Sequence, residues 1–510
     1  MKEMEKSPTE EKVVETYSIK SEGVETTMKI VIIDNTPVYT LILPDIDIAT
    51  LALLDSIKER LITGIEVNTA EVLDPEIIEE LKKAFRENAN KLLDEELPTL
   101  NKEIKDHFIL GLIHELIGLD EIEFFMDDTE LEEIVINSAK EPVRVYHKTY
   151  GWLTTNIYPQ SEAKIQNYSN TIARRINREI TTLNPMLDAH LMSNDRANAI
   201  LSPISSKGNT ITIRKFARDP WTTTDFIINK TANSEVLALI WHMIQYEMNI
   251  MISGGTGSGK TSFLNICMPF IPPNHRIISI EDTRELQLPG YLFWCPLTTR
   301  VPNPEGKGEV TMLDLLVNSL RMRPDRIVMG EVRKQREAEV LFEAMHTGHS
   351  VYCTVHADTC EQTVTRLTNP PVNIPNNMLD SVHLNVVMFR DRRRNIRRIF
   401  EIGEFIPDRS DGIKYKPYII YSWNPRNDEI AKTAEPLRLF SELERHTGLN
   451  KEESLSEIDQ KTKILNWLVK NNTRSMNDVG RIMNLYYMKK DSVIDAMNKN
   501  QNPNTLFKKL

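Results

Sequence analysis

The stretch that decides the fold reads Ile250-Met251-Ile252-Ser253-Gly254-Gly255-Thr256-Gly257-Ser258-Gly259-Lys260-Thr261. Its second part has the spacing Gly-x-x-x-x-Gly-Lys-Thr, the Walker A pattern of loops that bind nucleotide phosphates. The apolar residues before it predict a buried strand, so the loop would join a strand to a helix. A flexible glycine-rich linker is the alternative, but a linker requires neither the preceding strand nor the Lys-Thr pair.

The residue types of this loop suit an anion. Glycines let successive backbone N–H groups turn inward, in conformations that a Cβ would obstruct. The helix that starts at the loop points its positive end at the phosphates. Lys260 can reach the terminal phosphates, and the Thr261 hydroxyl can bind Mg²⁺. We predict that ATP binds to Gly254, Gly255, Thr256, Gly257, Ser258, Gly259, Lys260, Thr261 and Ser262. Adenine is favoured by default, because the sequence contains no strong Asn-Lys-x-Asp motif for guanine.

The bulk properties restrict the class of protein. Apolar residues make up 40% of the chain and charged residues 26%, as in a globular protein. The 62 basic and 73 acidic residues give a net charge of −11, which argues against a general nucleic-acid binder. We find no apolar run of the ~20 residues that a bilayer requires. The N-terminus has no secretory signal, and the four cysteines form no Cys-x-x-Cys pair. These features predict a cytoplasmic protein and leave room for docking onto a membrane partner.

The chain divides by pattern into three parts. Residues 1–28 mix Lys and Glu with few apolar positions, which predicts a mobile tail. Residues 29–222 predict a mixed α+β domain. Residues 223–510 alternate strands and helices, which predicts an α/β domain with a mostly parallel sheet, followed by a helical tail from about residue 437.

Acidic residues follow two predicted strands of the second domain. Glu281 and Asp282 come after the strand 276–280, and Glu331 follows Gly330 after the strand 326–329. The carboxyl ends of parallel strands face the ligand crevice, so these carboxylates can hold Mg²⁺ or activate water. Gly330 stands where many NTPases place the Mg²⁺-directed Asp. If Glu331 is the general base, Glu281 and Asp282 must serve the metal. The predicted metal ligands are Thr261, Glu281, Asp282 and Glu331. Surface acids after strands are the simpler alternative.

A third predicted strand, 349–355, ends at His356. We interpret His356 as a residue that can bond the γ-phosphate and report its loss. A histidine satisfied within the core is the competing interpretation, and only the position of His356 at the end of a strand favours function.

Four motifs now stand in order along the chain. They are the Walker A loop, an Asp box at 279–285, the Gly330-Glu331-Val332-Arg333 Walker B, and a His box ending Thr354-Val355-His356-Ala357-Asp358. Together they resemble the type II/type IV secretion and pilus-assembly ATPase superfamily, over about residues 183–404. The continuation Glu285-Leu286-Gln287-Leu288-Pro289 is similar to the archaeal branch. Within it the chain looks most like the ATPase of the archaeal flagellum (archaellum) or of an archaeal type IV pilus.

The resemblance implies a RecA-like ATPase core, a homo-hexameric ring, ATP sites near subunit boundaries and a membrane platform protein as partner. It implies that Glu331 is the leading general base and that Glu281 assists. It also implies that the N-terminal domain supplies arginines to the nucleotide, and Arg196 and Arg214 are the matching candidates. Structural ion pairing is the alternative for both. Asn194-Asp195 stands where relatives often have Asp-Gly.

The densest basic stretch, Arg390–Arg398, falls between two predicted strands and so predicts a hairpin tip. Attraction to an acidic partner or to anionic lipid is one interpretation, and a solvated turn is the other. No interleaved aromatic residues favour nucleic acid. A nucleic-acid translocase and a non-hydrolysing, nucleotide-bound scaffold remain the alternative functions.

Overall fold

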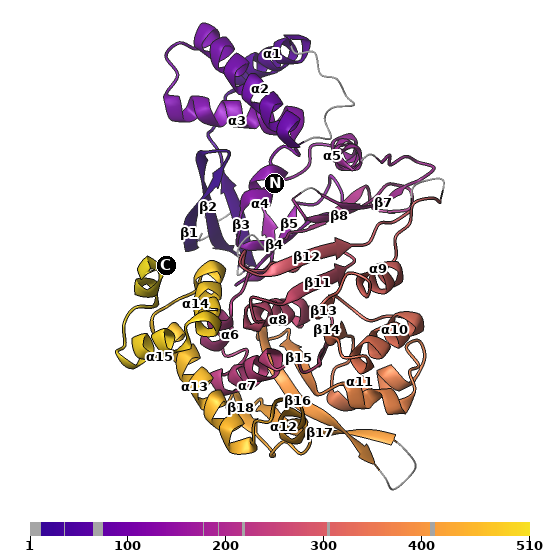
Figure 1. Ribbon diagram of the computed structural model, residues 1–510. Coiled ribbons are helices and arrows are strands. Elements are labelled where there is room, and N and C mark those ends of the chain that lie inside the picture. The colour runs from indigo at the N-terminus through magenta and orange to yellow at the C-terminus, as the bar shows by residue number, and fades with distance from the viewer. Residues whose placement is uncertain are drawn as a thin grey trace. The chain divides into compact units, whose positions relative to one another are not determined.

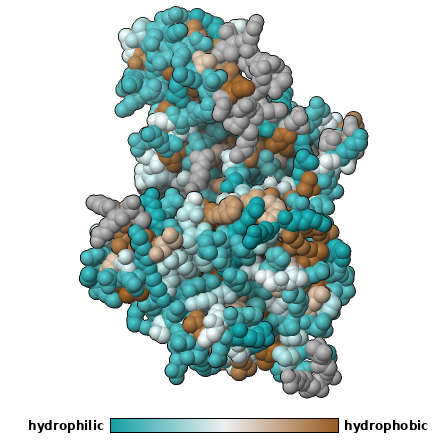
Figure 2. Space-filling view, viewed as in Figure 1, coloured by the Kyte–Doolittle hydropathy of each residue, from teal (hydrophilic) through white to brown (hydrophobic). Residues whose placement is uncertain are grey.

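The computed structural model describes residues 12–34, 36–64, 75–176, 178–191, 193–216, 220–302, 306–408 and 414–509 (Figure 1). The chain divides into two compact units, Met1–Asp219 and Pro220–Leu510. The face seen in Figure 2 is mostly hydrophilic, with scattered hydrophobic residues. In the ranges given above, no helix has both the length and the apolar character that a membrane span requires.

The first unit contains a nine-stranded sheet with the order β1-β2-β3-β6-β5-β4-β9-β8-β7. Its neighbouring strands are antiparallel, except for the parallel pair β3–β6. Within the sheet, β4 and β5 form an antiparallel hairpin. The strands are β1 Lys12–Ser21, β2 Val24–Ile33, β3 Thr36–Ile42, β4 Leu131–Ile136, β5 Arg144–His147, β6 Gly151–Thr155, β7 Met186–His190, β8 Arg196–Ile200 and β9 Thr210–Arg214.

The prediction of a mobile tail over residues 1–28 is wrong from residue 12 onward. β1 and β2 form an antiparallel hairpin whose turn contains Gly23 in a left-handed conformation, with φ +91°. Alternate side chains of β2, including Met28 and Ile30, are fully buried. The Lys and Glu residues between them dilute the apolar content and hide this period of two. Residues 1–11 lie outside the described residues.

Helices of the first unit form a small core of their own. Three of them pack around Ile57, Phe85, Leu93 and Ile113, all buried. A further helix, α5, lays Ile165 and Ile172 against the sheet core. The helices are α1 Ile48–Gly64, α2 Pro75–Glu96, α3 Lys102–Ile117, α4 Ile122–Asp127 and α5 Glu162–Arg175.

The second unit is built on another nine-stranded sheet, ordered β12-β11-β13-β14-β10-β15-β16-β17-β18. The strands from β12 to β15 are parallel, and β16 to β18 extend the sheet antiparallel. The strand before the phosphate loop, β10, lies between β14 and β15, and β13 separates β14 from β11. This RecA-like order confirms the predicted fold. The strands are β10 Ile250–Gly254, β11 Arg276–Glu281, β12 Phe293–Thr298, β13 Arg326–Met329, β14 Ser350–Val355, β15 Leu384–Asp391, β16 Ile396–Asp408, β17 Lys414–Asn424 and β18 Glu429–Lys432.

Helices bury both faces of this sheet. Met251 and Ile252, neighbours on β10, belong to separate apolar cores on opposite faces, as the alternation of a strand requires. The predicted helical tail is present, and its helix α13 (Lys451–Lys470) packs against α7 (Ser234–Gln245) (Figure 1). Leu465 and Met483 of the tail are fully buried in the same apolar core as the α7 side chains. The helices are α6 Thr223–Ile228, α7 Ser234–Gln245, α8 Lys260–Cys267, α9 Met312–Ser319, α10 Gln335–His346, α11 Cys360–Thr368, α12 Leu439–Thr447, α13 Lys451–Lys470, α14 Met476–Met488 and α15 Lys490–Asn498, with short 3-10 helices η1 Met268–Phe270, η2 Asn376–Ser381 and η3 Pro503–Lys509.

Candidate nucleotide site

The phosphate loop requires its glycines for conformation and for space. Gly254, Gly257 and Gly259 have φ values of +153°, +70° and +92°. A Cβ on Gly254 would lie 2.4 Å from Ser258 Oγ and 2.5 Å from the Met388 carbonyl oxygen. No side chain fits there without moving the backbone of β15. The loop is therefore a tight turn between β10 and α8, and Gly259 is the residue just before α8.

Several donors of the loop converge on one oxygen. The Lys260 ammonium donates to the carbonyl oxygens of Gly254 (2.9 Å) and Gly255 (3.0 Å). The Ser258 hydroxyl and N–H also donate to the Gly255 oxygen, at 2.9 Å and 3.3 Å. Thr261 is half-buried at the first turn of α8. A lysine, an inward N–H and a hydroxyl around one point suit the oxygens of a phosphate.

Strand register brings the acidic motifs to the loop. Ser253 on β10 pairs with Val355 on β14, so His356 follows next to Gly254. Met329 on β13 pairs with both Ile280 on β11 and Cys353 on β14. Glu281, Glu331 and His356 therefore leave neighbouring strands at one edge of the sheet, as the sequence predicted.

Glu331 is held by two cationic or hydrogen-bonding neighbours. Arg333 donates to its Oε2 from Nε (2.9 Å) and from Nη2 (2.7 Å), and also bonds Asp282 through Nη1. His356 Nε2 lies 3.3 Å from Glu331 Oε1. Burial and the nearby Lys260 lower the pKa of His356, so the imidazole is neutral near pH 7. A neutral imidazole protonated at Nε2 can donate to Glu331 and fix its orientation.

Glu281 is an almost completely buried carboxyl, with 2% of its surface exposed. Oε1 accepts the backbone N–H groups of Glu285 (2.9 Å) and Leu286 (3.1 Å), and Oε2 is buried without a hydrogen-bond partner among the described residues. Burial raises the pKa of Glu281 to about 7. A Cβ on Gly330 would lie 3.4 Å from Glu281 Cγ. This is an ordinary van der Waals distance, so position 330 packs directly against Glu281, but the space there does not by itself require a glycine.

The predicted metal ligands do not form a preassembled cage. Within the described parts of the chain, no group of three or more His, Cys, Asp or Glu side chains is placed to hold a metal ion. Asp282 and Glu331 share Arg333, and Glu281 binds backbone N–H groups. Mg²⁺ takes one or two protein ligands plus phosphate oxygens and water, so the Thr261 hydroxyl and the orphaned Glu281 Oε2 fit it.

The candidate arginines of the first unit lie side by side. Arg196 on β8 pairs in register with Arg214 on β9. Arg196 also forms a two-point ion pair with Asp188, at 3.0 Å and 2.6 Å, as the structural alternative predicted. Asn194 adopts φ +66°, a left-handed conformation that glycine adopts freely. The loop before Arg196 is therefore formed without glycine. A contact between these arginines and nucleotide stays a prediction.

Sequence reasoning missed three arginines at the site. Arg333 stands inside the Walker B motif, so the sequence could have indicated that it lies at the nucleotide site. Arg390 and Arg397 belong to the basic stretch for which the sequence left a partner or lipid surface and a solvated turn as alternatives, yet both lie against the phosphate loop. Arg397 Nε donates to the Gly257 carbonyl oxygen at 3.1 Å. Their proximity depends on β15 lying beside β10, which no local pattern reveals.

The rest of the basic stretch is partly engaged elsewhere. Arg398 is buried and forms a two-point ion pair with Asp428, with both distances 2.7 Å. Arg394 pairs with Asp391 at 2.7 Å. The exposed side chains of Arg392 and Arg393 remain at the hairpin tip. A lipid or partner role would therefore rest on fewer arginines than the sequence indicated.

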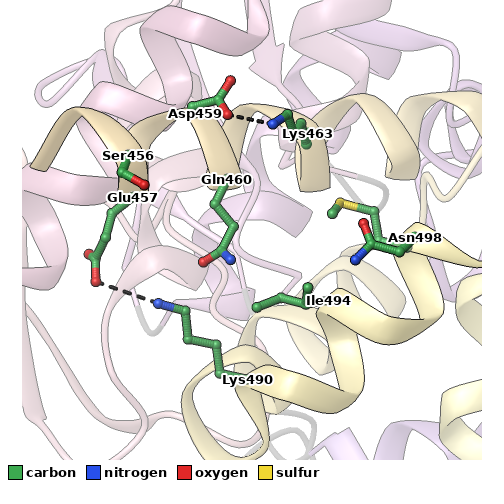
Figure 3. Close-up of a pocket in the computed structure, with 9 residues that line it drawn as sticks. Ser456, Glu457, Asp459, Gln460, Lys463, Lys490, Ile494 and Asn498 are labelled. Carbon is green, nitrogen blue, oxygen red and sulfur yellow. Dashed lines mark hydrogen bonds and ion pairs between the residues drawn. The ribbon is translucent and has the colours of Figure 1, made fainter. Parts of the chain in front are cut away.

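A cavity of about 360 Å³ lies away from this site, between α13 and α15 (Figure 3). Its charged side chains pair with one another: Glu457 with Lys490 at 3.5 Å and Asp459 with Lys463 at 2.5 Å. It lacks the glycine-rich backbone and the carboxylates of the site described above. We therefore place the candidate nucleotide site at the phosphate loop.

Comparison with known proteins agrees with this site. Residues 128–395 match the family described as Type II/IV secretion system protein, a span that includes all four motifs. The chain belongs to this family. With an intact phosphate loop and a carboxylate held after β13, this member of the secretion family is an ATPase.

Individual relatives are similar over long spans. An uncharacterized protein of Methanocaldococcus jannaschii, MJ0900, is 35% identical over 399 residues, which are 73% of this chain and 70% of that protein. The Type IV secretion system protein VirB11 of Bartonella henselae is 29% identical over 281 residues, 48% of this chain and 77% of that protein. Among solved structures, the VirB11 ATPase of Brucella suis in complex with sulphate matches 56% of this chain and 92% of its own, at 25% identity and a TM-score of 0.29.

Proposed function

We propose that this secretion-family ATPase is the subunit of a homo-hexameric, Mg-ATP-driven motor. Its work is assembly or rotation of an archaeal type IV pilus-like filament such as the archaellum. The observation that carries the proposal is a complete phosphate loop next to Glu331, whose two oxygens are held by Arg333 and His356. An archaeal pilus or type II-like secretion machine is the nearest alternative.

The chain's own residues divide the hydrolytic work. The loop N–H groups and Lys260 bind the phosphates, and Glu331 accepts the proton of the attacking water. His356 and Arg333 hold Glu331 in place for that transfer. When bound, Mg²⁺ neutralises charge on the β- and γ-phosphates, and Thr261 and Glu281 are the residues proposed to support it. For Asp282 or Glu331 to turn toward the nucleotide, its ion pair with Arg333 must first break.

Two further roles follow from the family resemblance. Arg196 and Arg214 are proposed to neutralise charge on the γ-phosphate once subunits close on one another. The membrane platform of the filament machine is the proposed partner, so the hexamer would work at the inner face of the cell membrane. Support for the archaeal assignment comes from the Asp-box continuation and from the similarity to proteins of an archaeon.

Hydrolysis is tested with purified full-length protein. Lys260→Ala is expected to abolish ATP binding, and Glu331→Gln to bind ATP but lose turnover by at least about a hundredfold, the usual contribution of a general base. Unchanged steady-state turnover in either variant would refute the site assignment.

The type of machine is tested by what stimulates turnover. We expect native mass spectrometry to show a hexamer in Mg-ATP, and we expect a membrane protein to co-purify from the source cells. Turnover that rises strongly with DNA or RNA, and not with the membrane partner, would instead favour a nucleic-acid translocase. A confirmed hexamer with undetectable turnover would favour the scaffold.

A further inference from the structure

The hairpin of β15 and β16 runs beside the phosphate loop. Met388 on β15 pairs with Gly254, the last residue of β10, so the residues after Met388 continue alongside the loop itself. Arg390, two residues further on, pairs across the hairpin with Arg397 on β16. Register alone thus brings two facing arginines to the phosphate loop.

Both arginines lie against the loop. The Arg397 Nε donates to the Gly257 oxygen at 3.1 Å, and its Cδ lies 3.3 Å from the place of a Cβ on Gly259. Arg390 Nη1 lies 2.8 Å from the place of a Cβ on Gly257. Gly257 therefore leaves room for the Arg390 guanidinium and Gly259 for the Arg397 side chain, in addition to allowing the turn itself.

The Arg397 contact fixes the direction of one peptide group. In a trans peptide the C=O and the next N–H point in opposite directions. With the Gly257 oxygen drawn outward to Arg397, the Ser258 N–H turns inward, and it does lie toward the Gly255 oxygen at 3.3 Å. Inward N–H groups in successive glycine-rich turns form the nest that binds anions. Arg397 can thus orient a phosphate donor without touching phosphate.

Charge gives the arrangement a second consequence. Like charges directly opposite each other on paired strands are destabilising, and Arg390 faces Arg397. A polyphosphate in the neighbouring loop reduces that repulsion. The hairpin therefore favours nucleotides that have a β-phosphate over nucleotides with a single phosphate.

We propose that Arg397 is a positioning residue that holds the Gly257–Ser258 peptide in its phosphate-binding orientation, and that Arg390 adds positive charge behind the same turn. The ligand class is a nucleoside di- or triphosphate. The inference rests on the proposed function, because it assumes that the loop binds Mg-ATP. It gives two arginines of the basic stretch a role at the nucleotide, which neither the partner or lipid surface nor the solvated turn predicted.

The test compares full-length Arg397→Gln and Arg390→Gln with Arg393→Gln, a matched control that removes the same charge from the exposed hairpin tip. Fluorescent ADP and AMP analogues report binding, and steady-state hydrolysis gives KM and kcat. Loss of one charged hydrogen bond is expected to weaken ADP binding by Arg397→Gln about tenfold, or about 1.4 kcal/mol. AMP binding and kcat should change little, while KM for ATP rises. Arg397→Lys, which keeps a donor, should recover part of the affinity.

The variants separate positioning from bulk charge. Arg390→Gln is expected to weaken ADP binding less, and because Arg390 is only half-buried, salt of about 1 M should reduce its effect by screening the charge. If Arg397→Gln does not fold, the salt-sensitive loss in Arg390→Gln still carries the test. Equal ADP affinity in the Arg397→Gln and Arg393→Gln proteins would overturn the inference and leave the function standing, as would an equal loss of AMP affinity. Wild-type protein that binds ADP but hydrolyses no ATP would overturn the function alone.

Discussion

Replacing Glu281 with Gln should change the stability of the second unit in a way that depends on pH. Burial raises the pKa of this carboxyl from its ordinary 4.5 to about 7. A raised carboxyl pKa means that the folded state keeps a proton that the unfolded chain has lost. The free energy of unfolding therefore falls as pH rises from 4.5 toward 7, and Gln, which does not titrate, removes this loss.

The magnitude follows from the two pKa values. Each pKa unit is worth about 1.4 kcal/mol, so the carboxyl costs about 3 kcal/mol at about pH 8 and under 1 kcal/mol at about pH 5. The Gln oxygen can still accept the N–H groups of Glu285 and Leu286, but its buried NH₂ replaces an oxygen that has no partner among the described residues. The free-energy cost of burying this NH₂ group does not depend on pH. The advantage of the variant over wild type should therefore grow by about 2.5 kcal/mol between those pH values.

Urea unfolding of metal-free protein, followed by tryptophan fluorescence, measures this change. Five of the six tryptophans lie in the second unit, so the signal reports mainly on it. In hydrolysis assays the same variant should be defective. Wild-type turnover should fall below about pH 7 as Glu281 takes up a proton, and the residual activity of the variant should not show this fall. A stability difference that stays constant across pH would refute the argument that burial holds Glu281 protonated.

Two further substitutions test separate parts of the second unit. Gly254→Ala should abolish nucleotide binding and lower the free energy of unfolding by at least about 2 kcal/mol, because its Cβ would overlap Ser258 Oγ and the Met388 carbonyl; ADP titration and urea unfolding measure both effects. His383, whose pKa burial lowers to about 3, accepts the Asn249 N–H through Nδ1. A lowered histidine pKa stabilises the folded state above about pH 6.5, the ordinary histidine pKa, and this stabilisation is lost as pH falls. Between about pH 7 and pH 5, the free energy of unfolding of the wild type should therefore fall by about 2 kcal/mol relative to that of His383→Gln. Acid unfolding curves that coincide for the two proteins would contradict this.

The sequence predicted the core of the second unit well, for physical reasons. Fully buried parallel strands are short apolar runs, and β10, β11, β13 and β14 each lead into one of the four motifs. Strand ends in such a sheet share one edge, so Glu281, Glu331 and His356 could be grouped from their positions in the chain alone. The phosphate loop was equally predictable, because few sequences other than a Walker A loop need that spacing.

Two features escaped the sequence because they depend on partners far away in the chain. The hairpin of β1 and β2 is half-exposed, and its Lys and Glu residues made residues 12–28 look like a tail. The strand order placed β15 next to β10, which are separated by more than a hundred residues, and so brought Arg390 and Arg397 to the loop. Local composition carries no information about either pairing.

Net charge misleads for a related reason. The chain carries −11 overall, yet the neighbourhood of the phosphate loop holds Lys260, Arg333, Arg390 and Arg397. Against them stand Asp282, Glu331 and Asp358, whose Oδ1 lies 2.8 Å from the place of a Cβ on Gly255, while Glu281 is largely protonated below its raised pKa of about 7. Cations therefore exceed ionised carboxylates at the site, although acids dominate the chain. A site with this excess attracts a polyphosphate before the nucleotide's own metal ion is considered, and it is the fold that concentrates the charge.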